Sequence, residues 1–496
     1  MKPRRSARQR LFRIVLLLSA LGVGGCITKR AYDRVRPLPP PTAGDASRGE
    51  WAFMESDLGS KDYASVPRAI WDALPVLYPD LFVEGWAGLG FLSRPDDPDG
   101  PPVGMVRTTV LGVETYASNC AICHAARIDG KIVAGAPNGD LDVQRITYTI
   151  MTALKREDLT VDAVARVSEA KGRPLGFRDR QAVRLWLGLA QRKASTRSLA
   201  WFKGELGPGR SDALNGWKRI LGAPEGEHRS WVDIPAIYNQ RLKKKMLLDG
   251  SVSGDPAVRV TMTELEKGRP ARDPLLHREV FDDIVAYLNE RIAPPRFPYP
   301  VDQDRAERGR ALFGETCASC HGTYGPGERT YPNKRIGVDR VGTDSERALA
   351  MTADITKPLV AYGYDALLSV DPQPTYTPPP LDGVWATAPY FHNGSVPTLW
   401  HLLSEEAERP VLFWRGRNEL DPIRVGIVCA EERGRGERLP GDPLACGKDG
   451  SQQKHDERVL FLFDARRPGN RNTGHRFGTT LPEGDKLALL EYLKTI

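Results

Sequence analysis

The stretch Cys317-Ala318-Ser319-Cys320-His321 decides how this chain folds, because its pattern occurs a second time. The other copy is Cys120-Ala121-Ile122-Cys123-His124. The 496 residues contain only seven cysteines and eight histidines, so two copies of the form C-A-x-C-H are not expected by chance. The repeat predicts two related halves, each organised around its own copy.

The pattern brings two thiols and one imidazole onto a single turn of chain. Covalent attachment of haem c requires these groups, since two cysteines add to the vinyl groups and the histidine binds the iron. A zinc site would need four closely grouped ligands, but the two cysteine pairs are 197 residues apart. A thioredoxin-like redox pair would not require the histidine. We therefore expect two haem c groups, one on Cys120 and Cys123 with His124 on the iron, and one on Cys317 and Cys320 with His321 on the iron.

Other parts of the two halves repeat in the same order. A segment from a proline to Gly-Ser-Val runs from Pro235 to Val252 and again from Pro380 to Val396. Each half then closes with a similar apolar helical pattern, at residues 284–288 and 489–493. In each half we expect one helix before the motif and a closing helix that crosses back over that first helix.

The helix before the second motif has a clear apolar face. Ala306, Gly309, Leu312 and Phe313 fall on one side at helical spacing. Gly309 has no Cβ, so it would let the closing helix approach closely.

The fold class expected from these patterns is mainly α, with two cytochrome c-type haem domains and long loops. The first domain would cover residues 50–293, with an insertion at 128–230 that includes an amphipathic helix at 178–193. A proline-rich linker, 294–303, would lead to the second domain, 304–496.

The N-terminal residues have the features of an export signal. Six basic residues precede a short apolar run, which is too short to span a bilayer. Residues 23–26 resemble the lipobox of bacterial lipoproteins. We expect a signal peptide at 1–25 and a proline-rich tether at 26–49 anchored by lipid on Cys26, on the periplasmic side of a membrane, with the outer membrane favoured. The alternative is an ordinary signal peptide with an incidental cysteine.

Charge gives no support for nucleic-acid binding. Without the six basic residues of the signal, the chain has 64 basic and 63 acidic residues. Cys429 and Cys446 remain after the other cysteines are assigned, and they would either pair in an oxidising compartment or stay as thiols.

The second half resembles the bacterial dihaem cytochrome c peroxidases and, more closely, the dihaem rubber oxygenases. Residues 380–399 and 463–478 carry the resemblance, which is specific mainly after Cys317. It implies that His475 is the second ligand of the second haem and that His392 is structural. It also implies an N-terminal haem that is the active one and open to O2. The chain is shorter than the rubber-cleaving enzymes, so rubber is not the expected substrate.

Two functions remain open. The favoured one is a haem-dependent oxidoreductase that activates peroxide or O2 on the open face of the haem held by His124, with the second haem as electron relay. The alternative is a dihaem electron carrier in which Met246 or Met262 closes the first iron. Either function needs an electron donor or acceptor protein. Glu114 is expected as a solvated helix residue, and Trp231 and Trp385 as packing residues or as stepping stones between the haems.

Overall fold

The computed structural model describes residues 36–60, 65–196, 206–267, 273–325, 329–361, 364, 368–416, 419–428 and 461–496. The expected signal peptide, Cys26, Cys429, Cys446 and His455 lie outside these ranges. Within them, no helix has the length and apolarity needed to cross a membrane.

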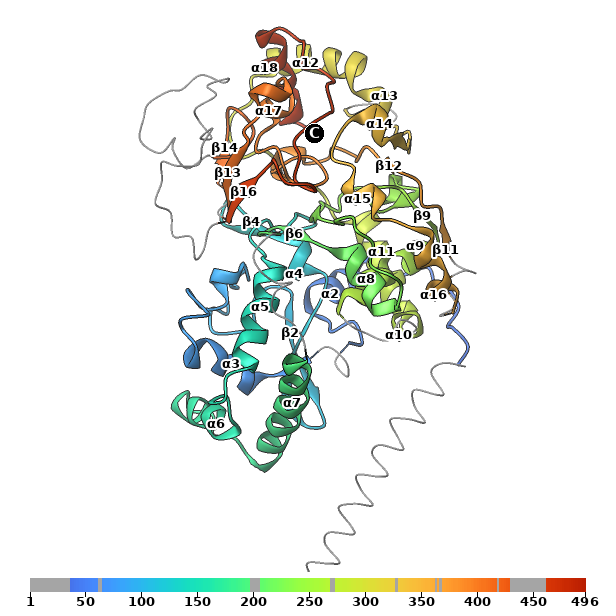
Figure 1. The fold of residues 1–496 in the computed structure, drawn as a ribbon. Helices are drawn as coiled ribbons and strands as arrows, with labels where there is room; N and C mark the ends of the chain where they lie inside the picture. The colour runs from blue at the N-terminus through green and yellow to red at the C-terminus, as the bar shows by residue number, and fades with distance from the viewer. Residues whose placement is uncertain are drawn as a thin grey trace, which may run out of the picture.

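The expectation of a mainly α fold is wrong. Helices account for 40% of the structure and strands for 14%, and the described strands form two three-stranded and five two-stranded sheets (Figure 1). Most of these strands have two to four residues, which is too short for the apolar alternation that identifies a strand in sequence. Some pair with nearby strands, such as β4 (Ala125–Ile128) with β5 (Lys131–Ala134), and others with distant ones, such as β13 (Leu412–Arg415) with β16 (Phe461–Asp464).

The second half contains the crossing helices predicted around its motif. α12 (Gln303–Thr316) packs against α18 (Glu483–Leu493) at the top of Figure 1. A Cβ on Gly309 would lie 2.0 Å from the Ala488 carbonyl oxygen, so the close approach predicted for this glycine is confirmed. The rings of Phe313 and Tyr492 lie beside the crossing, with their centres 5.3 Å apart.

The first half repeats this crossing with α2 (Ala46–Glu55) and α11 (Arg278–Glu290). A Cβ on Gly49 would lie 1.9 Å from the Asp283 carbonyl oxygen. Phe53 and Tyr287 have ring centres 5.5 Å apart, as in the second half. The packed chain thus begins inside the segment expected to be a tether, and the Asp45 backbone N–H donates to Asp283 Oδ1 at 2.7 Å.

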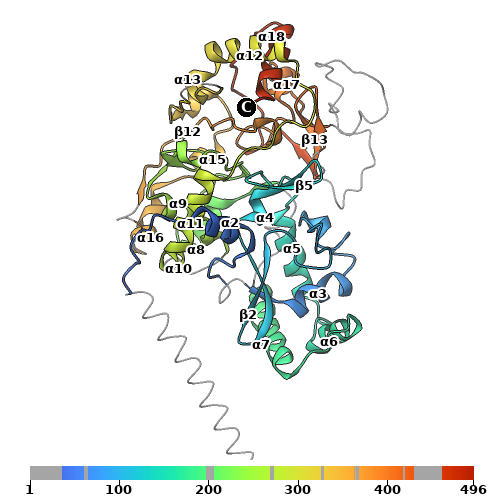
Figure 2. The ribbon, with the colours of Figure 1, turned by 180° about the vertical axis from the view of Figure 1, so that it is seen from behind.

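A separate lobe is inserted into the first half in two pieces (Figures 1 and 2). One piece lies between α2 and the first motif, and the other between residues 139 and 196. The sequence predicted only the second piece, where the helix expected at 178–193 is present as α7 (Phe177–Ser195). The lobe has its own apolar core, which includes Ile70, Trp71, Val164, Val183 and Leu187. Its elements are β1 (Ser65–Pro67), α3 (Arg68–Leu77), η1 (Ala87–Leu89), β2 (Met105–Val110), β3 (Val113–Ser118), α5 (Val143–Leu154), α6 (Val161–Ala170) and α7 (Phe177–Ser195).

The two halves share a sheet and an apolar core. Strand β11 (Leu368–Val370) of the second half pairs antiparallel with β9 (Val252–Gly254) of the first. A core between them joins Trp217 and Met262 to Met351 and Tyr364. The other first-half elements are α4 (Ala121–His124), β4 (Ala125–Ile128), β5 (Lys131–Ala134), β6 (Arg210–Ser211), α8 (Ala213–Leu221), β7 (Val232–Asp233), η3 (Gln240–Leu242), β8 (Lys245–Met246), α9 (Pro256–Thr261), η4 (Met262–Lys267) and α10 (Asp273–Leu276).

The second half consists mostly of short elements between its two crossing helices. These are α13 (Ala318–His321), β10 (Ile336–Gly337), α14 (Val338–Val341), α15 (Glu346–Leu349), η5 (Ala353–Ile355), α16 (Thr356–Ala361), β12 (Thr375–Tyr376), η6 (Val384–Ala386), α17 (Leu399–Leu402), η7 (Glu406–Glu408), β13 (Leu412–Arg415), β14 (Leu420–Asp421), β15 (Gly426–Ile427) and β16 (Phe461–Asp464).

Candidate haem sites

Each C-A-x-C-H motif forms a single helical turn, α4 in the first half and α13 in the second. The backbone N–H of His124 donates to the Cys120 carbonyl at 3.0 Å, and that of His321 donates to the Cys317 carbonyl at 3.0 Å. All four cysteines are partly buried. One turn therefore carries two thiols and an imidazole in both halves, as the spacing predicted.

Each motif histidine makes the same hydrogen bond to a proline carbonyl. His124 Nδ1 lies 3.1 Å from the Pro235 oxygen, and His321 Nδ1 lies 2.9 Å from the Pro379 oxygen. Since a carbonyl only accepts, Nδ1 must be the protonated nitrogen, which leaves the lone pair of Nε2 available. Burial lowers the pKa of His321, and it lowers the pKa of His124 to about 4. Both imidazoles are therefore neutral, which is the form that binds a metal.

The segments that begin at these prolines have matching backbones. They run from 235 to 252 and from 379 to 396, and each contains a short 3-10 helix, η3 or η6. Left-handed residues recur at the same steps, with φ of 65° and 69° at Leu247 and Phe391, and of 64° at both Gly250 and Gly394. Antiparallel contacts join Met246 to Val252 and Tyr390 to Val396. The repeat predicted from sequence is thus present in the structure, with Pro379 and not Pro380 as the counterpart of Pro235.

The second motif has another imidazole beside it. The ring centres of His321 and His475 lie 6.4 Å apart. Two imidazoles on opposite sides of one metal, each with a bond of about 2 Å, would have ring centres roughly 6 Å apart. This pair and the two thiols of Cys317 and Cys320 supply the axial ligands and the covalent links that a haem c uses. The residues present therefore fit a bis-histidine haem.

The loop that carries His475 is fixed by several polar contacts. The buried Arg409 donates to the Gly474 carbonyl at 2.8 Å, while Glu406 Oε1 accepts from the Gly474 N–H at 3.0 Å and from Arg476 Nε at 2.8 Å. The His475 N–H donates to the Val341 carbonyl at 2.7 Å. A Cβ on Gly474 would lie 2.2 Å from the carbonyl carbon of Gly342, so only glycine fits there. Burial lowers the pKa of His475 to about 3.

The other described histidines have different partners. His392 Nε2 lies 3.0 Å from the Tyr376 hydroxyl, and His401 Nδ1 lies 2.7 Å from Thr398 Oγ1. His228 Nδ1 lies 3.2 Å from Glu346 Oε1. His277 is the N-cap residue of α11, the helix-start position predicted for it. These contacts are typical of structural histidines.

The first site lacks an equivalent of the His321–His475 pair in the described part of the chain. No ring contact joins His124 to another histidine there. Met262 is fully buried in the core between the halves, and Met246 lies on β8 within the segment that starts at Pro235. Glu114 was expected on a helix but lies on strand β3. Its Oε1 accepts a hydrogen bond from Arg68 Nη1 at 2.8 Å.

The two tryptophans expected as packing residues or stepping stones, Trp231 and Trp385, are both buried and packed against neighbouring groups. Trp231 lies under the guanidinium groups of Arg210 and Arg229, at 5.3 and 5.1 Å from the ring centre. Trp385 Nε1 donates to the Pro295 carbonyl at 3.2 Å.

Sequence reasoning missed one buried aromatic residue that touches both halves. The Tyr238 ring would lie 2.7 Å from a Cβ on Gly135, which follows β5, and 3.2 Å from a Cβ on Gly383 of the second half. Tyr238 lies three residues after Pro235. A lone tyrosine outside any motif gives no signal in sequence.

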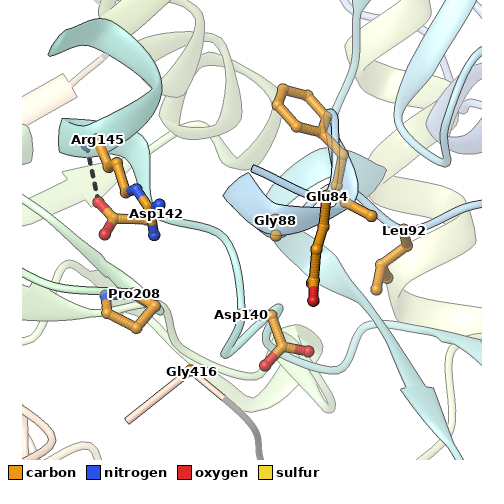
Figure 3. Close-up of a pocket in the computed structure, with 11 residues that line it drawn as sticks. Glu84, Gly88, Leu92, Asp140, Asp142, Arg145, Pro208 and Gly416 are labelled. Atoms are coloured by element: carbon orange, nitrogen blue, oxygen red, sulfur yellow. Dashed lines mark hydrogen bonds between the residues drawn. The ribbon is translucent and has the colours of Figure 1, made fainter. Parts of the chain in front are cut away.

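A separate polar cavity of about 160 Å³ lies between the lobe and the second half (Figure 3). Glu84, Asp140, Asp142 and Arg145 line it, with Gly416 from the second half. Asp142 caps α5 by accepting from the Arg145 N–H at 2.8 Å, and burial raises its pKa. The cavity does not include a motif residue. Among the described residues, no three His, Cys, Asp or Glu side chains form a group that could hold a metal ion.

Comparison with known proteins finds two relatives and one family model that matches part of the second half. Over 299 residues the chain is 30% identical to an uncharacterised protein, y4iM, of Sinorhizobium fredii (strain NBRC 101917 / NGR234), covering 53% of this chain and 64% of that protein. It is also 30% identical over 348 residues to an uncharacterised protein, y4iJ, of the same strain, covering 54% of this chain and 53% of that protein. The chain thus spans less than two thirds of either relative. Residues 375–415, which include Pro379 and His392, match the family model described as RoxA-like, cytochrome c-like, so this part of the chain is similar to a cytochrome c-like group with haem-dependent redox function.

Proposed function

We propose that this protein is a dihaem c-type cytochrome that acts as an oxidoreductase. Peroxide or O2 would be activated at the site of His124, and electrons would pass through the site of His321. The cytochrome c-like match and the two equivalent motif turns support two haem c sites.

The observation that carries the proposal is the difference between two otherwise similar sites. Both motif histidines donate from Nδ1 to a proline carbonyl, but among the described residues only His321 has a second imidazole at a distance suited to a shared iron. A haem with two strong protein ligands transfers electrons, whereas one with a free axial position also binds a small oxidant.

The chain's own residues have distinct roles in this proposal. The carbonyls of Pro235 and Pro379 hold each imidazole in one tautomer and increase the basicity of Nε2. Arg409 and Glu406 hold the His475 loop in place. The apolar core around α2 and α11, which includes Phe53, Ala121 and Ala125, would exclude water from the first site.

A second candidate is an electron carrier without enzymatic activity. Met246 lies in the segment that starts at Pro235, at the position that corresponds to Tyr390 in the second half. The Met246 thioether, bound to the first iron, would occupy its free axial position.

One measurement separates the two functions. Absorption spectra of the purified protein would be recorded in the oxidised state, the reduced state and the reduced state with carbon monoxide. The oxidoreductase requires carbon monoxide binding at one of the two haems, and the electron carrier predicts binding at neither.

We also propose export to the periplasmic side of a bacterial membrane, with a lipid anchor on Cys26. The lipobox-like residues 23–26 support this proposal. Growth with a labelled fatty acid should label the protein, and Cys26→Ser should abolish the label. Equal labelling of the variant would contradict the anchor.

A further inference from the structure

Helix α7 of the inserted lobe presents large apolar side chains to solvent. Phe177, Leu185 and Leu189 are 79%, 66% and 64% exposed. The opposite face of the helix is packed into the lobe through Val183 and Leu187. The exposed apolar side chains are therefore held on a rigid support and are not left over from a loosely packed helix.

The tip of the β2–β3 hairpin continues this apolar surface. Leu111, at the tip, is 93% exposed. The next residue, Gly112, lies against α7, since a Cβ there would be 3.4 Å from Arg178 Nη1. Figures 1 and 2 both show the hairpin beside α7. We call the exposed side of α7 together with Leu111 the α7 face.

The α7 face is strongly basic. The exposed positions of α7 contain five cationic side chains and no carboxylate: Arg178, Arg180, Arg184, Arg192 and Lys193. Asp179 is only partly exposed and accepts from the Gly176 N–H. Arg180 forms an ion pair with Asp162 at 3.4 Å. Arg178, Leu185, Leu189 and Arg192 follow one another along the helix at spacings of three, four or seven residues, which places them on one stripe.

The α7 face is distant from the chemistry proposed above. The lobe lies at the end of the molecule opposite α12 and α18, and it carries neither motif (Figure 1). A face with this composition is therefore available for a role other than haem binding.

We propose that the α7 face lies on an anionic lipid surface. Leucine and phenylalanine side chains interleaved with arginines suit the boundary between headgroups and acyl chains, where apolar side chains insert and cations contact lipid phosphates. The apolar stems of the arginines lie along the same boundary.

The proposal is tested with the full haem-loaded chain and a fluorescent label that responds to the acyl-chain boundary. The label is attached through Leu189→Cys on the α7 face, and in a control protein through Ile423→Cys, which replaces a 52% exposed side chain in the second half. Each protein is incorporated into vesicles of phosphatidylcholine, with or without phosphatidylglycerol. We expect a blue shift for the label at 189 in phosphatidylglycerol vesicles that salt reverses, and none for the label at 423.

Removing two charges from the α7 face should weaken the contact. Each basic residue near an anionic surface strengthens binding roughly fivefold, so Arg178→Gln with Arg192→Gln should lower the partition of the label by about an order of magnitude or more. The matched control is Arg305→Gln with Arg310→Gln on α12, which removes the same charge elsewhere. The proposal would be overturned if the label at 189 responded equally to both lipid compositions or if its response were unchanged after the α7 substitutions. It would also be overturned if the blue shift came only from protein that is not bound to vesicles.

Discussion

The imidazole rings of His321 and His475 lie with their centres 6.4 Å apart and their planes inclined by 59°. One ring comes from the motif turn and the other from the loop before the last helix. This separation suits two imidazole ligands of one metal ion, and among the described residues it distinguishes the second site from the first.

His475→Ala should convert the second haem from a low-spin to a high-spin iron, because it removes one of two strong axial ligands. Electron paramagnetic resonance of the oxidised protein would show the change. His228→Ala is the control, since this half-exposed histidine contacts Glu346 and neither motif. A low-spin signal that persists in H475A would show that another residue is the ligand.

Glu406→Ala should loosen the loop that carries His475 without removing this ligand. The carboxylate accepts from the Gly474 N–H and from Arg476, so its loss frees the loop on one side of His475. We expect a mixture of low-spin and high-spin iron whose high-spin share grows with temperature. Glu408→Ala, an exposed neighbour on the same short helix, should leave the spectrum unchanged. Equal spectra for the two variants would mean that Glu406 does not position His475.

Carbon monoxide should bind the first haem in the reduced protein and leave the second unaffected. In the H475A variant it should bind both, since the second iron would then have a free position. The expected ratio of bound carbon monoxide to protein is one in the parent and two in the variant, measured from the absorption change. Binding to neither haem in the parent would contradict the enzymatic function and favour the electron carrier.

Cys317→Ala with Cys320→Ala should leave a chain with a single covalent haem. The thiols are the only covalent links that the motif provides, and Cys120 and Cys123 remain in the first half. The mass of the intact protein after maturation would decrease by one haem. Ser319→Ala, between the two cysteines, should retain both. A double variant that still carried two haems would refute the assignment of the motif.

Gly309→Ala should destabilise the protein by about 1–3 kcal/mol, because the added methyl group would overlap the Ala488 carbonyl. Gly314→Ala is the matched control on the same helix, since a Cβ there meets nothing within 4 Å. It should stabilise the helix by about 0.5–1 kcal/mol. Denaturant unfolding of the haem-loaded protein measures both. A loss of stability in Gly314→Ala equal to that in Gly309→Ala would show that close helix packing is not the cause.

Sequence alone located the two motifs and the helices α7, α11, α12 and α18. The crossing of α12 with α18 could be predicted because Gly309 and its apolar neighbours follow the helical period. A matching crossing was expected in the first half, but the position of α2 was not, because the lobe separates α2 from its motif and proline-rich sequence precedes it. The small sheets were missed because most of their strands are too short to show an apolar alternation, and some, such as β13 with β16, pair across a long distance in the chain.

What the sequence by itself determined is the local chemistry: two thiols and an imidazole on one turn need only the C-A-x-C-H spacing, which any helical turn brings together. What only the tertiary structure decided is the partner of each group. The carbonyls of Pro235 and Pro379 are backbone atoms with no signature in sequence, and they reach their histidines across 111 and 58 residues. The position of His475 opposite His321 likewise depends on Arg409 and Glu406, because a side chain far away in sequence comes to a site only through the contacts that fold its loop.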